Sequence, residues 1–180
     1  MKIQQFIKTL NNTEIGKGGT HECYVLVSRK VSGIDKIFDS NNLRPRFLNL
    51  KNGGVVDSVH ITKGREFRIN GLGDFYRANN VNAGDEIIFE RRDSEDEVEF
   101  FLNLRVKTNI ITFQKSSKGI VVLNIDRLSP KLVNGSYSLL ANYLGKSSNV
   151  IIQFKESLLM RSDSPSKTDF YIITVDGIDV

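Results

Sequence analysis

Residues 61–90 have the sequence ITKGREFRINGLGDFYRANNVNAGDEIIFE, in which a basic segment, a short helical pattern and an apolar strand follow one another. Leu72, Phe75 and Tyr76 have the spacing that places side chains on one inward face of a helix. Two consecutive asparagines follow, which is typical of a helix end. β-branched and aromatic residues then favour a strand. The segment therefore predicts a basic loop, a brief helix and a strand, in that order.

Local signals upstream of this segment predict further short elements. Four apolar residues recur at the i, i+3, i+4, i+7 spacing of an amphipathic helix at the N-terminus: Ile3, Phe6, Ile7 and Leu10. Residues 23–31 favour a strand, and residues 32–40 favour a short helix with Ser32 as its N-cap. Residues 44–62 are typical of a hairpin, because Asn-Gly-Gly lies between two apolar runs.

The C-terminal half is also rich in predicted strands. Runs of β-branched and aromatic residues occupy residues 97–113, 120–125, 149–155 and 169–178, whereas residues 137–144 are a helix candidate. No alternation of strands with long helices is present. We therefore expect a mainly β fold with short helices, closed as a barrel or sandwich, and a single domain over residues 1–180.

The composition excludes several classes of protein. Apolar residues make up 39% of the chain and charged residues 26%, which fits a globular domain. The apolar runs fall far below the roughly 18 to 20 residues of a transmembrane helix, and the N-terminus lacks the apolar stretch of a signal peptide. One cysteine and two histidines cannot form an internal disulfide or a closed zinc site. We expect a cytoplasmic protein without a membrane partner, a metal or a cofactor.

The charge is unevenly distributed along the chain. The net charge is +4, but residues 1–84 carry 13 Lys and Arg against 7 Asp and Glu, while residues 85–99 carry 2 against 8. One acidic segment therefore hides part of the basicity of the N-terminal half. If that segment faces away from the rest, the N-terminal half can present a positive surface to phosphate groups. An ordinary solvated turn is the alternative interpretation of the acidic segment.

The order of elements predicted over residues 15–92 resembles that of the plant B3-type DNA-binding pseudobarrel. Glycines, a helical phenylalanine and an apolar strand match the pattern of that family at Gly71, Phe75, Asn80-Val81, Ala83, Gly84-Asp85 and Ile87-Ile88-Phe89. Leu72 replaces the tryptophan that plant members have after the glycine, which argues against a plant transcription factor. The resemblance implies a B3-like DNA-binding pseudobarrel over residues 15–92, with residues 93–180 completing or extending the barrel.

Two segments are similar to the N-terminal effector domain of EcoRII-type restriction endonucleases, a bacterial branch of the same superfamily. Residues 16–38, GKGGTHECYVLVSRKVSGIDKIF, resemble its first DNA-contacting arm together with the strand and the helix that follow that arm. Arg65-Glu66-Phe67-Arg68 resembles its second arm, in which arginines flank a glutamate. The resemblance implies the effector domain of a type II restriction endonuclease from a bacterial cytoplasm, whose C-terminal nuclease domain is missing here.

The resemblance also places the two arms beside one another, in the major groove of duplex DNA. Arg65 and Arg68 could then each donate to guanine, and Glu66 could accept from cytosine, which implies a short G/C-containing site. The first arm would contribute Lys17, Thr20, His21 and Glu22, with Lys17 on phosphate. Further candidates for contacts to the DNA backbone are Arg44, Arg46, Lys63 and Asn70.

Plainer interpretations of these residues remain open. Arg65, Glu66 and Arg68 are also consistent with a solvated charge cluster. His21 is equally consistent with a hydrogen-bonded surface residue, and His60 is expected in a strand. Cys23 is expected to be a small core residue, because a reactive thiol needs an electropositive and partly exposed setting.

Two functions other than DNA recognition by an effector domain also remain open. A small metal-dependent nuclease would need carboxylates near a lysine, but no Asp-x-Lys or Glu-x-Lys occurs. The nearest substitute combines Asp126 with Gln153 and Lys155. The other alternative is a protein-interaction barrel whose basic loops are incidental. A DNA-binding domain like that of a transcription regulator is a further variant of DNA recognition.

Overall fold

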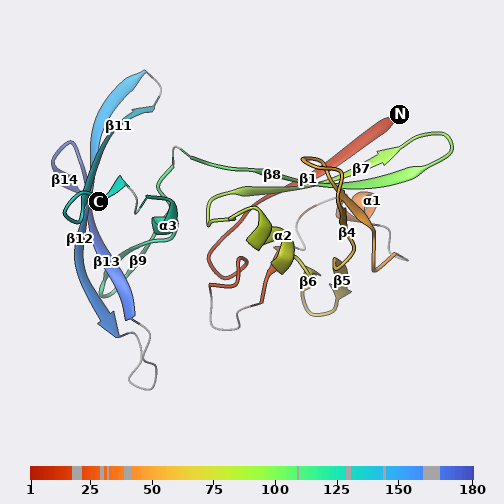
Figure 1. Cartoon of the computed structure of the whole chain (residues 1–180), viewed down its shortest axis with the longest axis horizontal. Helices are drawn as coiled ribbons and strands as arrows, with labels where there is room; N and C mark the ends of the chain where they lie inside the picture. Colours follow the sequence, from red (N-terminus) through yellow and green to blue (C-terminus); the bar gives the residue numbers. More distant parts are fainter. Residues whose placement is uncertain are drawn as a thin grey trace. The chain divides into compact units, whose positions relative to one another are not determined.

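A computed structural model describes residues 1–17, 22–28, 31, 33–38, 42–108, 110–128, 131–143, 145–159 and 167–180. The described chain consists mainly of strands with short helices, which confirms the predicted mainly β class. It divides into two compact units, Met1–Ile110 and Ile111–Val180 (Figure 1). Whereas the sequence suggests one domain, each unit has its own sheet, so each is described separately. None of the helices in the described ranges is long and apolar enough to cross a membrane.

The first unit is built on a sheet with the strand order β1-β7-β8-β3-β4. Its strands are β1 (Lys2–Thr9), β3 (Phe47–Asn49), β4 (Val55–Val56), β7 (Glu86–Asp93) and β8 (Val98–Arg105). Neighbouring strands are antiparallel except β3 and β8, which are parallel. Strands β1 and β8 flank β7 along its whole length, so every residue of β7 has a partner on both sides.

An aromatic cluster fills the core beneath β7. The ring of Phe89 lies 5.5 Å from that of Phe38, 5.6 Å from that of Phe47 and 6.1 Å from that of Phe6, measured between centroids. Phe38, Phe47 and Phe89 are almost completely buried. Burial of several phenylalanines supplies much of the apolar area that stabilises the unit.

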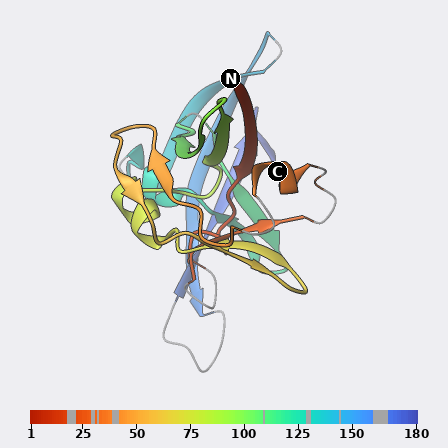
Figure 2. The same ribbon diagram turned by 90° about the vertical axis from the view of Figure 1, so that its right-hand side faces the viewer.

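A second, smaller sheet of the first unit has the order β2-β6-β5, and it is called the small sheet below. It consists of β2 (Tyr24–Val27), β5 (His60–Lys63) and β6 (Phe67–Asn70), all antiparallel. Two short helices, α1 (Ile34–Ile37) and α2 (Gly73–Ala78), complete the unit. Figure 2 shows the hairpin of β5 and β6, in yellow, projecting from the body of the unit.

The locally encoded elements agree with the sequence-based expectations. Helix α2 forms where predicted, with Leu72, Phe75 and Tyr76 buried and Asn79 at its C-terminal end. Helix α1 also forms, but its N-cap position is Gly33 without a side-chain cap, and Ser32 lies outside the described residues. The hairpin of β3 and β4 turns through Asn-Gly-Gly, where the amide of residue 49 donates to the carbonyl of residue 54 at 2.8 Å.

The predicted N-terminal helix is wrong, because residues 2–9 form strand β1. This strand pairs with β7 along its full length. Phe6 faces inward, whereas Ile3 and Ile7 are 49% and 45% exposed, so the apolar residues do not share one buried face. Pairing with a buried strand satisfies the backbone groups of β1 and outweighs its helical pattern.

The second unit has a sheet in the order β11-β12-β13-β10-β9, with β14 beside β13. Its strands are β9 (Phe113–Ser116), β10 (Gly119–Val122), β11 (Ser136–Tyr143), β12 (Lys146–Leu159), β13 (Lys167–Val175) and β14 (Ile178–Asp179). Helix α3 (Ile125–Leu128) contributes the buried Leu128 to the core on one face of the sheet. Ile152, Tyr171 and Ile173 are central members of that core.

One expectation about the C-terminal half needs correction. The helix predicted over residues 137–144 is instead strand β11, which pairs antiparallel with β12. Tyr137, Leu139 and Ala141 alternate toward the core, which suits a strand. Among the described strands after residue 93, β8 joins the sheet of the first unit, whereas β9 to β14 form the sheet of the second. The strands after β8 therefore do not extend the first sheet.

Candidate nucleic-acid interface

The small sheet has one apolar and one polar face. Val25, Ile61 and Ile69 lie opposite one another in register and are almost fully buried on the inner face. Side chains alternate along a strand, so the neighbouring residues face outward. The residues that alternate onto the outer face are Tyr24, Leu26, His60, Thr62, Arg68 and Asn70. This face concentrates hydrogen-bonding groups on a short antiparallel ribbon.

Arg68 lies at the centre of the outer face. Its Nε and Nη2 groups both donate to Oε2 of Glu66, at 2.8 and 2.5 Å, and its guanidinium lies 4.7 Å from the centroid of the Tyr24 ring. Its Nη1 group is 4.0 Å from Oε2 of Glu22. The hydrogen bond to Glu66 raises the pKa of Arg68 further, so the guanidinium stays charged. Glu66, just before β6, therefore contacts Arg68 from one end of the small sheet. Glu22 and Tyr24, at the start of β2, contact it from the other end.

The turn between β5 and β6 is the predicted second arm. Arg65 is exposed in this turn, and the ammonium group of Lys63 lies 5.5 Å from the centroid of the Phe67 ring. An open hollow of about 560 Å³ borders the turn, lined by Thr62, Lys63, Gly64, Arg65, Glu66 and Arg68. The structure therefore brings the three predicted residues Arg65, Glu66 and Arg68 together with Lys63 around one open surface.

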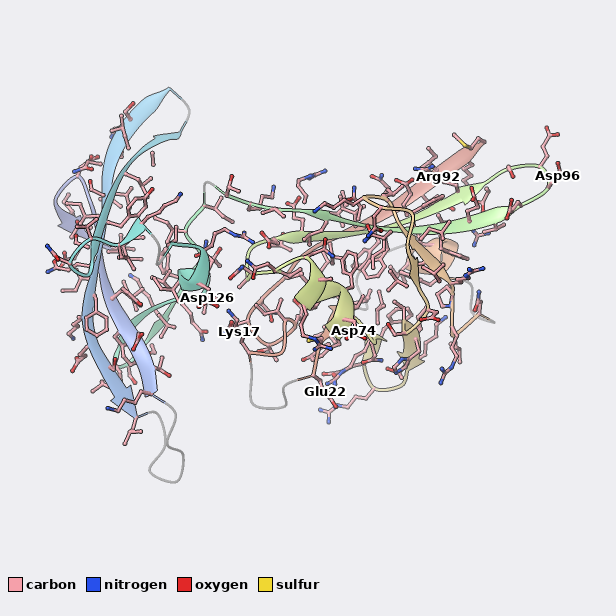
Figure 3. The ribbon with its side chains drawn as sticks, viewed as in Figure 1. Lys17, Glu22, Asp74, Arg92, Asp96 and Asp126 are labelled. Atoms are coloured by element: carbon pink, nitrogen blue, oxygen red, sulfur yellow. The ribbon has the colours of Figure 1, made fainter. Side chains whose placement is uncertain are left out.

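Part of the predicted first arm can be placed. Ile15 and Cys23 form an isolated bridge, which brings the two ends of the arm together. Lys17 is exposed on the incoming side, and Glu22 on the outgoing side has a side chain that is 66% exposed (Figure 3). Gly18, Gly19, Thr20 and His21 lie outside the described residues.

The strand register separates the two arms. Tyr24 lies opposite Asn70, and Val27 lies opposite Phe67, so the first arm enters at one end of the ladder and the turn at 64–66 lies at the other. A four-residue strand spans about 10 Å. The resemblance implied arms beside one another at one end of a barrel. In the structure the turn at 64–66 lies at the other end of the small sheet from Glu22, the described outgoing edge of the first arm, but Arg68 of the second arm reaches to within 4.0 Å of Glu22.

Asn70 and His60 are at the first-arm end of the same face. The Nδ2 group of Asn70 donates to Oγ1 of Thr62 at 3.1 Å, and His60 begins strand β5, as expected. A hollow of about 330 Å³ lies here, lined by Glu22, Cys23, His60, Asn70, Gly71, Gly73 and Arg77. Cys23 is half-buried, and burial raises the pKa of its thiol. The thiol is therefore protonated at neutral pH. The sequence predicts Cys23 as a small core residue, whereas it lines this hollow and is only half-buried.

Arg44 and Arg46 are exposed on a segment beside β5. The amide of Ile61 donates to the carbonyl of Leu43 at 2.8 Å, which places the start of this segment against the outer edge of the small sheet. Both arginines are therefore close in sequence to a residue that is fixed at the sheet edge, while Pro45 between them is buried.

The acidic segment lies on β7, on β8 and in the turn between them, apart from the arms. Figure 3 shows Asp96 at the tip of this hairpin, at the opposite end of the unit from Lys17 and Glu22. Within the hairpin, Glu90 pairs with Arg92 at 2.5 Å. The negative charge is therefore directed away from the small sheet or neutralised locally.

The alternative nuclease residues are divided between the faces of the second sheet. Asp126 is an exposed residue of α3, the helix that contributes Leu128 to the core on one face of the sheet. Gln153 lies between Ile152 and Phe154, which face that core, and therefore points to the other face. Lys155 pairs with the adjacent Glu156 at 3.3 Å. Within the described ranges, no three His, Cys, Asp or Glu side chains gather as metal ligands.

Tyr24 belongs to this site, although the sequence pattern does not identify it. Its position next to Cys23 in an apolar run indicated only a strand. The sequence offers one signal for Tyr24, namely an aromatic residue directly after the first arm. Aromatic rings are the partners on which arginine side chains stack.

Similar proteins are found among solved structures. No family model matches the chain, and no curated protein matches it. Among solved structures, the chain is similar to the Arabidopsis FUS3-DNA complex, with a TM-score of 0.41 and 14% identity, covering 56% of this chain and 95% of that chain. The function proposed for this chain therefore rests on the chemistry of its own residues.

Proposed function

We propose that this chain binds duplex DNA sequence-specifically, through the outer face of the small sheet and the arms at its two ends. The observation that carries the proposal is the hollow beside the β5–β6 turn, whose lining includes three cations, Lys63, Arg65 and Arg68, and one carboxylate, that of Glu66. A major groove about 12 Å wide admits a two-stranded β-ribbon of this kind. Cations at its rim can contact phosphates while arginine contacts base edges.

The arginines favour guanine as one of the recognised bases. Arginine has parallel donors that match the O6 and N7 acceptors of guanine, which is the commonest specific contact in the major groove. We therefore propose a short G/C-containing site. The likeness of both arms to restriction-enzyme effector domains supports the further proposal that this chain targets a nuclease domain located elsewhere.

Alanine substitutions should separate base contacts from phosphate contacts. We expect Arg65→Ala and Arg68→Ala each to lose about 1 to 3 kcal/mol of discrimination at individual base pairs, because a bidentate contact to guanine is lost. Lys17→Ala should weaken binding to all duplexes similarly, since phosphates are the same in every sequence. The measurement is competition binding against a panel of single base-pair variants. An equal loss for all three proteins on specific and nonspecific duplexes would contradict the assignment.

We infer that this chain alone binds DNA without cutting it. Metal-assisted cleavage needs carboxylates that converge near a positioned water. Asp126 lies in α3 on the core face of the second sheet, whereas Gln153, which is an amide and not a carboxylate, alternates onto the other face. We expect no nicking of supercoiled plasmid by purified protein in magnesium or manganese. Nicking that is abolished by Asp126→Ala and retained by Arg65→Ala would overturn this inference and favour the nuclease.

A further inference from the structure

The guanidinium of Arg68 is fixed before any ligand binds. Glu66 accepts hydrogen bonds from Nε and Nη2, the Tyr24 ring lies under the guanidinium plane, and Glu22 lies 4.0 Å from Nη1. As a result the Arg68 side chain is only 35% exposed although it lies on the outer face of the sheet. A free arginine side chain has several rotatable bonds, and ordering it on binding costs conformational entropy. In this protein the Arg68 side chain is already ordered in the folded state, before a ligand binds.

The contact with Glu66 leaves one edge of the guanidinium for a ligand. Arginine has five N–H donors, and Glu66 uses the Nε donor and one Nη2 donor. The outer N–H of Nη2 and an N–H of Nη1 are parallel and form a second donor pair. This pair matches the N7 and O6 acceptors of guanine. Glu66, whose carboxylate already holds Arg68, is therefore placed to position the arginine rather than to accept from cytosine.

Tyr24 supplies the platform on which the guanidinium rests. Its side chain is 9% exposed, and its partner across the ladder is Asn70 on β6. A guanidinium over an aromatic face gains about 0.5 to 2 kcal/mol from cation–π attraction. The covered ring itself presents little surface to a ligand.

We propose that Tyr24 and Glu66 are positioning residues that hold Arg68 as a preformed guanine reader, so that they set base selectivity without contacting the bases. This inference rests on the proposed DNA-binding function. It assigns to Glu66 a role that differs from the cytosine contact implied by the family resemblance.

The test measures the selectivity for one guanine rather than overall affinity. The probes are a duplex selected by the wild-type protein from random oligonucleotides and copies in which each guanine in turn is replaced by 7-deazaguanine, which lacks N7. The wild-type protein should bind one substituted copy about tenfold more weakly, and Arg68→Ala should abolish that ratio. Tyr24→Leu and Glu66→Gln should reduce the ratio to about twofold or less, whereas Tyr24→Phe, which keeps the ring, should retain it.

Glu66→Gln gives the sharpest outcome, because affinity and selectivity should change in opposite directions. Loss of a negative charge near phosphate should strengthen binding to a random duplex, while loss of the fixed guanidinium weakens the N7-dependent ratio. Asp96→Asn, at the tip of the β7–β8 hairpin, is the matched charge control and should leave the ratio unchanged.

The inference is overturned if Glu66→Gln keeps the guanine ratio, or instead loses discrimination at a separate cytosine. It is also overturned if Tyr24→Leu, with its folding verified by thermal unfolding, keeps the ratio. Because Glu66 is exposed, its variant tests the inference even if Tyr24→Leu fails to fold. A wild-type protein that selects no duplex overturns the proposed function itself, and is thereby distinguished from these results.

Discussion

Raising the salt concentration from about 50 to 200 mM should weaken specific DNA binding by about a thousandfold or more. This is the expected loss for a protein that contacts roughly 6 to 10 phosphates, because each contact releases condensed counterions from the DNA. The exposed cations that would make such contacts include Lys17, Arg44, Arg46 and Lys63. Titration of a fluorescent duplex at several salt concentrations measures the slope of log affinity against log salt.

Single substitutions provide the control for this salt dependence. Removing one phosphate contact, as in Lys17→Ala, should reduce the slope by about 1 without changing which duplex is preferred. An affinity that does not depend on salt, or equal affinity for every duplex at all salt concentrations, would contradict the proposed mode of binding.

The elements that could be predicted from the sequence are those whose signals lie within a few residues. Helix α2 is specified by the spacing of Leu72, Phe75 and Tyr76, and the β3–β4 turn by consecutive Asn-Gly-Gly. In both cases the decisive interactions are local, because an amphipathic turn and a left-handed glycine depend on adjacent residues.

The elements that could not be predicted depend on partners that are distant in the chain. β1 and β11 both carry helix-like patterns. β1, however, pairs with residues that lie 77 to 91 positions further along the chain, and β11 pairs with the long strand β12. Burial of Phe6 against Phe89 decides the conformation of β1, and nothing within residues 1–12 encodes that contact. Tertiary pairing therefore overrides local pattern at both positions.

The candidate site likewise has a part that could be predicted from the sequence and a part that could not. The sequence predicts which charged residues occupy the second arm, because Arg65, Glu66 and Arg68 are adjacent. It does not predict that Arg68 lies over Tyr24, because that contact depends on the register of β2 against β6. A shift of one residue would turn Arg68 to the inner face. The role of Glu66 as a holding group, too, becomes visible only from the direction of its side chain.

Gly71→Ala should lower the free energy of unfolding by at least about 3 kcal/mol. Gly71 joins β6 to α2 with a φ of +78°, which L-residues rarely adopt, and a Cβ here would lie 2.0 Å from the carbonyl oxygen of Ser58. Ser58 also donates from Oγ to the carbonyl of Gly71 at 2.6 Å, so the two backbones cannot separate without losing that bond. Chemical denaturation of both proteins measures the difference.

Two other glycines distinguish steric overlap from backbone strain. Gly53 has a φ of +69°, but nothing lies within 4 Å of the Cβ that alanine would add. Gly53→Ala should therefore lower the free energy of unfolding by only about 1 to 2 kcal/mol, through backbone strain. Gly64 has neither a positive φ nor an atom within 4 Å of the added Cβ. The free energy of unfolding of Gly64→Ala should therefore stay within about 0.5 kcal/mol of the wild-type value. If Gly71→Ala were no worse than Gly53→Ala, the close approach of Gly71 to Ser58 would not be holding the end of β6. Asn70, which precedes Gly71 on the outer face, should then keep its contact with Thr62. If the larger loss is found, the close approach of Gly71 to Ser58 contributes, together with the ladder pairing of Asn70, to fixing the end of the small sheet that carries the first arm.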